Sequence, residues 1–180
     1  MEKRIKRKQN RINALSEAQT LAFAPLTFQA LATMIDIGLL KLLDKHKASL
    51  EEIMSSLKVN EYIARTLLQV GCVINVFENI DNKYTLSAKG EAFLYDEMTI
   101  ANFNFVKDIC YLGASELTQS FLQEKPIGLQ KFIKNKETIY PLLPNLPEPL
   151  KSSWYEFDNL YSDNCFDKIF EIISANFNKI

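Results

Sequence analysis

The fold is decided by residues 49–90, which read SLEEIMSSLKVNEYIARTLLQVGCVINVFENIDNKYTLSAKG. Ser49 and Glu52 have the spacing of a capping box, which predicts that a short helix begins there. Asn60 is a further cap residue, and apolar residues at helical spacing predict another helix over residues 61–71. Two short helices joined by a tight turn form a helix-turn-helix unit.

A β-hairpin is predicted directly after this unit. Two runs rich in β-branched and aromatic residues, 73–79 and 83–87, are separated by the polar turn Ile80-Asp81-Asn82. Ser87 then caps a further helix that reaches about Leu94. This order of elements is typical of a winged helix. We therefore expect a mainly α fold: a winged helix with a small β-hairpin wing and additional long helices.

Upstream of the winged helix, residues 26–43 (LTFQALATMIDIGLLKLL) are predicted to form one long helix. A capping box at Ser16 and Gln19 predicts an earlier helix that ends or kinks at Pro25. The 26–43 helix is apolar on nearly every side, so it must be covered on both sides. We assign one face to a homodimer interface, with a central core helix of one domain as the alternative. The residues of this predicted interface are Phe28, Leu31, Ile35, Leu39 and Leu42.

Downstream, residues 98–123 are predicted to form a second long helix. Ser153 and Glu156 have the spacing of a third capping box, which predicts a final helix to about Phe177. This helix carries a cluster of aromatic residues. The cluster has two interpretations, the wall of a small-molecule pocket or ordinary helix packing, and the residues taken alone favour packing. Its members are Trp154, Tyr155, Phe157, Tyr161 and Phe166.

Charge is unevenly distributed along the 180 residues, although the formal net charge is only −1. Residues 1–11 hold six basic residues and one acidic residue, a net charge of +5. This basic tail could contact nucleic acid or another anionic surface, but no second basic run supports that function, and we favour a solvated helix start. Residues 48–94 hold four basic and six acidic residues, a net charge of −2 and the wrong sign for a phosphate backbone. We therefore expect no nucleic-acid partner.

The residue types that carry catalytic and metal chemistry are sparse and scattered. The three cysteines form no CxxC pair, the single histidine lies in a polar Lys-His-Lys turn, and the five glycines form no phosphate-binding loop. We assign no catalytic, cofactor-binding or metal-binding residue to the chain, and we expect a reduced, cytoplasmic setting. Polar residues interrupt any apolar run of about 20 residues, so we expect no membrane span.

Residues 26–94 resemble the N-terminal winged-helix dimerisation domain of class I S-adenosylmethionine-dependent O-methyltransferases. Met54 stands where the family usually has Ala, and Ser87 stands where it usually has Thr. The matching motifs are Gly38-Leu39-Leu40, Leu50-Glu51-Glu52-Ile53, Leu67-Leu68 and Tyr84-Thr85-Leu86-Ser87-Ala88-Lys89-Gly90. Three later stretches resemble the helical connector of a bacterial branch of the family. They are KPIGLQKF (125–132), TIYPLLPNLPEPL (138–150) and SSWYEFDNLYSDNCF (152–166).

The resemblance implies three segments: a basic tail (1–11), a winged-helix dimerisation domain (12–95), and a helical connector (96–180) that leads toward a methyl-donor-binding domain absent from these residues. It implies S-adenosylmethionine as the cofactor of a full-length member, with none bound by this chain. The implied role is to pair subunits and to form part of the lid over a small-molecule substrate, without activity in isolation. Trp154, Tyr161 and Asp163 are the candidate pocket-wall residues. A winged-helix DNA-binding regulator is the alternative function, and an adaptor that pairs with a full-length methyltransferase is another.

Overall fold

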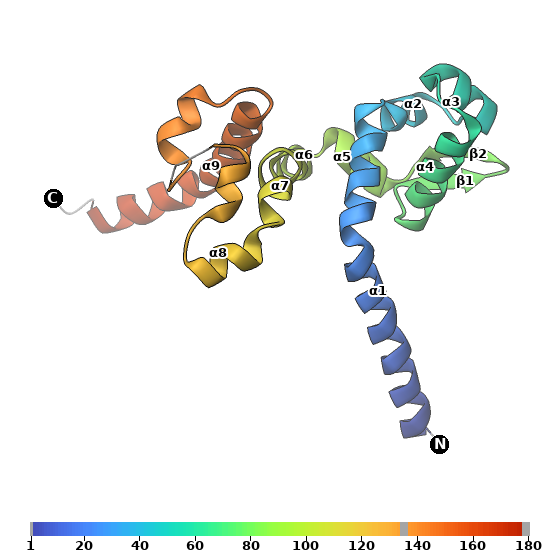
Figure 1. Ribbon diagram of the computed structural model, residues 1–180, viewed down its shortest axis with the longest axis horizontal. Coiled ribbons are helices and arrows are strands. Elements are labelled where there is room, and N and C mark those ends of the chain that lie inside the picture. The colour runs from blue at the N-terminus through green and yellow to red at the C-terminus, as the bar shows by residue number, and fades with distance from the viewer. Residues whose placement is uncertain (1, 134–136, 178–180) are drawn as a thin grey trace. The chain divides into compact units, whose positions relative to one another are not determined.

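A computed structural model describes residues 2–133 and 137–177 of the chain. The chain divides into two compact units, Met1–Leu94 and Tyr95–Ile180. Both units are built from helices, and the sheet among the described residues is a single two-stranded hairpin (Figure 1). The prediction of a mainly α fold with a winged-helix arrangement is confirmed.

The first unit places a long helix beside the helix-turn-helix and the wing. Strands β1 (Phe77–Ile80) and β2 (Lys83–Leu86) are antiparallel, and Asp81 and Asn82 join them in the left-handed conformation that a tight two-residue hairpin turn requires. The elements of this unit are α1 (Glu2–Asp36), α2 (Leu39–Lys45), α3 (Leu50–Leu57), α4 (Glu61–Val73), β1 (Phe77–Ile80), β2 (Lys83–Leu86) and α5 (Ala88–Tyr95).

The predicted caps of the winged helix form as expected. The Ser49 N–H donates to the Glu52 carboxylate at 2.7 Å, and the Glu52 N–H donates to the Ser49 hydroxyl. The first of these bonds lowers the pKa of Glu52 because it stabilises the ionised carboxylate. Asn60 accepts from the Ile63 N–H at 2.9 Å, and Ser87 accepts from the Gly90 N–H at 3.1 Å. Local hydrogen bonding therefore fixes where these helices begin.

The first predicted strand begins four residues too early, because α4 continues to Val73. Asn75 then adopts the left-handed conformation with φ 57°. The Val76 N–H donates to the Gly71 carbonyl and the Asn75 N–H to the Cys72 carbonyl, which is the Schellman pattern of helix termination. Strand β1 begins only at Phe77, after this turn.

Helix α1 corrects two predictions about the N-terminal residues. It begins by Glu2 rather than at Ser16, and it passes through Pro25 without a break, so residue 11 marks no structural boundary. Proline removes only one backbone donor from a helix. In the next turn the Thr27 hydroxyl donates to the Ala24 carbonyl at 3.0 Å and to the Phe23 carbonyl at 3.4 Å.

The apolar stretch 26–43 is two helices, not one. Gly38 separates α1 from α2 with φ 80°, a conformation that strains any residue with a side chain. The resulting turn folds α2 back so that both helices contribute to the core of the first unit. The fully buried side chains of this core are Met34, Leu39, Leu40, Leu43, Ile53, Leu68 and Val76.

By length and composition alone, α1 could cross a membrane over Lys6–Asp36. Core helices of soluble proteins meet the same two criteria. The expectation that the chain has no membrane span therefore stays a prediction.

The second unit replaces the long helix predicted over residues 98–123 with several shorter segments. A π-helical segment, η1, follows α6, and the turn at Ser115 and Glu116 separates α7 from α8. The elements of this unit are α6 (Glu97–Asn104), η1 (Phe105–Cys110), α7 (Tyr111–Ala114), α8 (Leu117–Gln123), η2 (Ile127–Lys131), η3 (Tyr140–Asn145) and α9 (Leu150–Phe177).

Ser153 has a different role from the predicted helix cap. Helix α9 already begins at Leu150, so Ser153 lies within its first turn. The Ser153 side chain is buried, and its hydroxyl donates to the Asp108 carboxylate in η1 at 2.6 Å. The Asp108 side chain is only 11% exposed, so its carboxylate needs such a donor, and this bond therefore ties α9 to the π-helical segment.

Candidate functional site

The five residues predicted to form a dimer interface do not share one exposed face. Leu31 and Leu39 are buried in the core of the first unit, with Leu39 only 1% exposed. Phe28, Ile35 and Leu42 are half-buried. A side chain that is already enclosed by its own unit has little surface left for a partner. Leu39 therefore fits the alternative interpretation of this stretch, a core helix.

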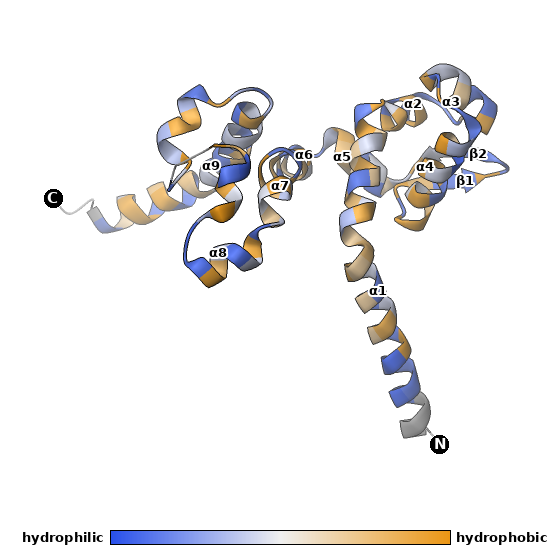
Figure 2. Ribbon diagram, viewed as in Figure 1, coloured by the Kyte–Doolittle hydropathy of each residue, from blue (hydrophilic) through white to orange (hydrophobic). Residues whose placement is uncertain are grey.

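An exposed apolar face of the first unit lies further toward the start of α1. Every side chain from Lys6 to Phe23 is exposed, and Figure 2 shows apolar residues along this half of the helix beyond its basic start. Successive helix residues are about 100° apart, so residues spaced by 3, 7, 11 and 14 positions lie on one side. We name this side the arm face, and its residues are Ile12, Leu15, Gln19, Phe23 and Leu26.

The apolar members of the arm face are 50–67% exposed, which is unusual for large hydrophobic side chains on one stripe. Leu21 is also exposed, but it lies on the opposite side of α1 by the same angular spacing. An isolated helix in water gains little stability from its backbone alone, and tertiary packing of an apolar face supplies most of it. The arm face is thus a surface that another molecule could cover.

A groove of about 780 Å³ lies beside this face within the first unit. One wall is α1, including Gln19 and Phe23 of the arm face, and the other is the turn after α4. Val73 on the second wall is 79% exposed. The Lys89 ammonium lies at the groove and donates to the Ile74 carbonyl at 2.8 Å. The arm face and the groove therefore form one continuous, mainly apolar surface.

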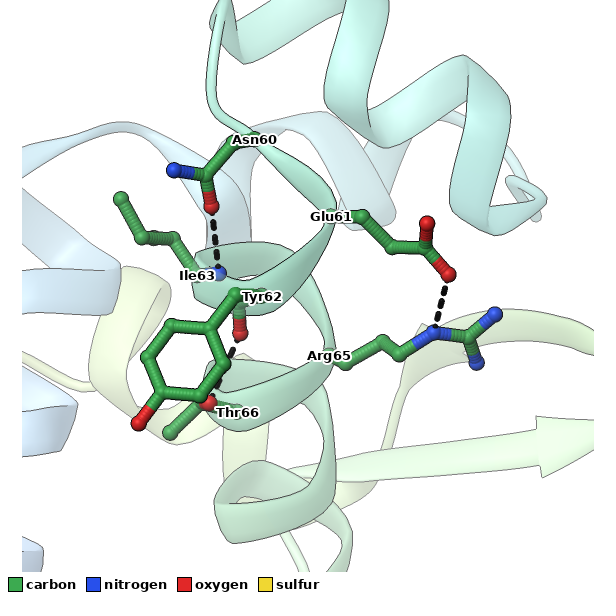
Figure 3. Close-up of polar contacts among 6 residues, drawn as sticks. All are labelled: Asn60, Glu61, Tyr62, Ile63, Arg65 and Thr66. Carbon is green, nitrogen blue, oxygen red and sulfur yellow. Dashed lines mark hydrogen bonds and ion pairs between the residues drawn. The ribbon is translucent and has the colours of Figure 1, made fainter.

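The outward face of α4 is where a helix-turn-helix protein would read DNA. Arg65 is the only basic residue of this helix, and its guanidinium Nε is 2.6 Å from the Glu61 carboxylate (Figure 3). The neighbouring Thr66 hydroxyl donates to the Tyr62 carbonyl of the same helix. This ion pair leaves the outward face of α4 without net charge, whereas a face that binds phosphates carries a net positive charge.

The candidate pocket-wall residues of α9 lie in different surroundings. Trp154 is half-buried and lines a groove of about 530 Å³ in the second unit. Tyr161 does not line this groove; its hydroxyl donates to Asn102 in α6 at 3.1 Å, and its ring packs on Phe157. Asp163 is exposed and is not among the lining residues either. The structure thus does not bring the three residues together around this groove.

The Trp154 groove has an apolar lining and one thiol. Burial raises the pKa of the Cys110 thiol, so it stays protonated near neutral pH and is a poor nucleophile. Other lining residues are Leu117, Leu129, Phe132 and Tyr140. The ring of Tyr140 packs edge-on to Trp154 with centroids 6.1 Å apart. Sequence reasoning did not bring these residues together, because Leu117, Leu129 and Tyr140 belong to three separate elements, α8, η2 and η3.

Comparison with known proteins agrees with this architecture. Residues 16–84 match the family model of the Dimerisation2-like domain. No curated protein matches the sequence.

Several solved structures share the fold at low sequence identity. The apo form of the S-adenosylmethionine-dependent methyltransferase SibL is 22% identical, with a TM-score of 0.70, over 83% of this chain and 45% of that one. Mitomycin 7-O-methyltransferase MmcR is 15% identical, with a TM-score of 0.65, over 83% and 44%. The N,N-8-amino-8-demethyl-D-riboflavin dimethyltransferase RosA from Streptomyces davawensis is 14% identical, with a TM-score of 0.61, over 87% and 45%.

The chain thus spans less than half the length of these structures. MmcR and RosA are named for different methyl acceptors, so the likeness concerns the fold and not the substrate. Residues 16–84 thus match the Dimerisation2-like domain, and the chain shares the fold of the N-terminal region of these methyltransferase structures.

Proposed function

We propose that this chain is the dimerisation module of a small-molecule methyltransferase, and that it pairs two copies of itself through the arm face. The observation that carries this proposal is the row of exposed apolar residues on α1, part of which lies within the matched residues 16–84. Covering such a row removes apolar surface from water, which is the main driving force of association. A second copy presents the same row, as a two-fold interface requires.

The second unit supplies part of the wall of a substrate site in this proposal. The Trp154 groove supports that role because it is apolar and aromatic, as sites for small organic molecules are. Methyl transfer would need groups beyond those described here. A site for S-adenosylmethionine would need a strand followed by a glycine-rich loop and a helix. Residues 2–133 and 137–177 contain no such succession, since their one sheet is the β1–β2 hairpin. The described residues therefore do not fit the methyl donor.

The mass of the protein in solution tests the pairing. We expect light scattering coupled to size exclusion to give about twice the chain mass of 20.7 kDa at micromolar concentration. Dilution should shift the population toward the single chain if association is reversible. A mass of one chain at all concentrations up to about 100 µM would contradict the proposal. A dimer with a micromolar dissociation constant would be mostly formed at that concentration.

Calorimetric titration with S-adenosylmethionine tests whether this chain binds the methyl donor by itself. We expect no saturable heat from this chain, because the described residues lack a site of suitable chemistry. A full-length methyltransferase of the same fold class serves as the positive control under identical conditions. Saturable binding in the micromolar range would show that the chain contributes a donor site of its own.

A further inference from the structure

We propose that the two copies pair their α1 helices antiparallel, with Gln19 of each copy at the two-fold axis. This inference rests on the proposed dimerisation and adds the direction, the register and the occupant of the groove. It follows from three features of the first unit: the spacing of the arm face, the charge at the start of α1, and the groove beside Phe23.

The spacing of the arm face is symmetric about Gln19. Leu15 and Phe23 lie four residues before and after it, and Ile12 and Leu26 lie seven residues before and after it. In an antiparallel pair centred on Gln19, Ile12 meets Leu26 of the partner subunit, and Leu15 meets Phe23 of the partner subunit. All four exposed apolar residues of the face are covered in this register. A shift by one turn leaves part of the face uncovered.

Gln19 itself favours this register. It is the one polar member of the arm face, and its exposed amide carries both a donor and an acceptor. Two such amides facing each other at the axis can satisfy one another by hydrogen bonds. In a register that places Gln19 opposite Leu15 or Phe23 of the partner subunit, each amide faces an apolar side chain and loses its partner, as polar residues do in misaligned helix pairs.

The charge at the start of α1 sets the direction. Residues 1–11 carry a net charge of +5, so a parallel pair would bring two such segments side by side. In the antiparallel pair, Arg7 lies twelve residues from the axis, or about 18 Å at 1.5 Å per residue. The two Arg7 side chains then lie about 36 Å apart, well beyond the screening length of about 8 Å at physiological salt. Repulsion between the basic segments is thereby removed.

The groove provides a place for the partner's helix. Gln19 and Phe23 belong to both the arm face and the groove, so a helix lying on the face also covers the opening of the groove. In the antiparallel register, Arg11 of the partner subunit lies level with Thr27 along α1, and Lys8 of the partner subunit lies level with Ala30. The other wall of the groove contains the carboxyl end of α4, where helix carbonyls favour positive charge. Lys89 already places one positive charge there, because its ammonium donates to the Ile74 carbonyl.

Disulfide trapping tests direction and register in the full chain. In a background with Cys72, Cys110 and Cys165 replaced by alanine, one sample carries Ile12→Cys and another carries Leu26→Cys. We expect a disulfide-linked dimer in the mixture of the two samples and essentially none in either sample alone. Two Ile12→Cys positions lie about 21 Å apart in the proposed pair at 1.5 Å per residue. A disulfide needs Cα atoms within about 7 Å.

Leu21→Cys is the matched control, because Leu21 is at least as exposed but lies on the opposite side of α1. We expect it to cross-link with neither variant. Cross-linking of the Ile12→Cys sample by itself would show a parallel pair and overturn the inference. So would an uncross-linked mixture whose mass by light scattering is that of a dimer. A single-chain mass of the cysteine-free background would instead refute the proposed dimerisation itself.

Discussion

Replacing Leu15 and Leu26 together by lysine is expected to separate the dimer into folded single chains. Both side chains are more than half exposed in the single chain and become covered only on pairing. Covering each is worth about 1–2 kcal/mol, scaled from about 1.5–3 kcal/mol for a fully buried side chain. Four such side chains per dimer give a dissociation constant at least about 10³-fold weaker. Light scattering across a dilution series measures the change.

The control for this double variant is Leu21→Lys, which places the same charge on the opposite side of the same helix. We expect its dimer to persist, because Leu21 lies outside the arm face. Circular dichroism should show near-native helix content in both variants, since none of these side chains contributes to the core. If the Leu15→Lys, Leu26→Lys variant remained a dimer, the interface would lie outside the arm face. The exposed apolar residues Phe166, Ile169, Phe170 and Ile173 of α9 would be the next candidates.

The features predicted well from the sequence are those fixed by neighbours along the chain. Ser49, Asn60 and Ser87 cap their helices as expected because each cap needs only the next turn of backbone. The same spacing misled at Ser16 and Ser153, which lie inside longer helices. A pattern of two residues cannot distinguish the start of a helix from its interior when the preceding residues also favour helix.

The dimer surface was harder to predict because periodicity shows that a face is apolar but not what covers it. Leu39 has the spacing of an interface residue, yet the turn at Gly38 folds it into the core. Ile12 and Leu15 were not singled out because polar residues surround them in the sequence. Their exposure follows from the length of α1, which extends beyond the elements that cover its second half (Figure 1).

Leu39→Asp is expected to unfold the first unit rather than to release a folded single chain. Leu39 is 1% exposed, so an aspartate there must bury a carboxylate or open the core. Truncation of a buried leucine alone costs about 2–5 kcal/mol. Burial of an unpaired charge adds several more, against a total stability of about 5–15 kcal/mol for a domain. We expect loss of cooperative thermal unfolding by circular dichroism and rapid cleavage of the first unit in limited proteolysis.

Two comparisons separate this outcome from a loss of pairing. Lys41→Asp introduces the same side chain at an exposed position of α2 and should leave both folding and mass unchanged. Leu39→Ala should keep the fold with a lowered melting temperature and remain a dimer, because it weakens the core without touching the arm face. A Leu39→Asp protein that is folded and monomeric would instead place Leu39 at the interface. That result would mean that α2 rearranges on pairing, because an enclosed side chain can reach a partner only if the core around it opens.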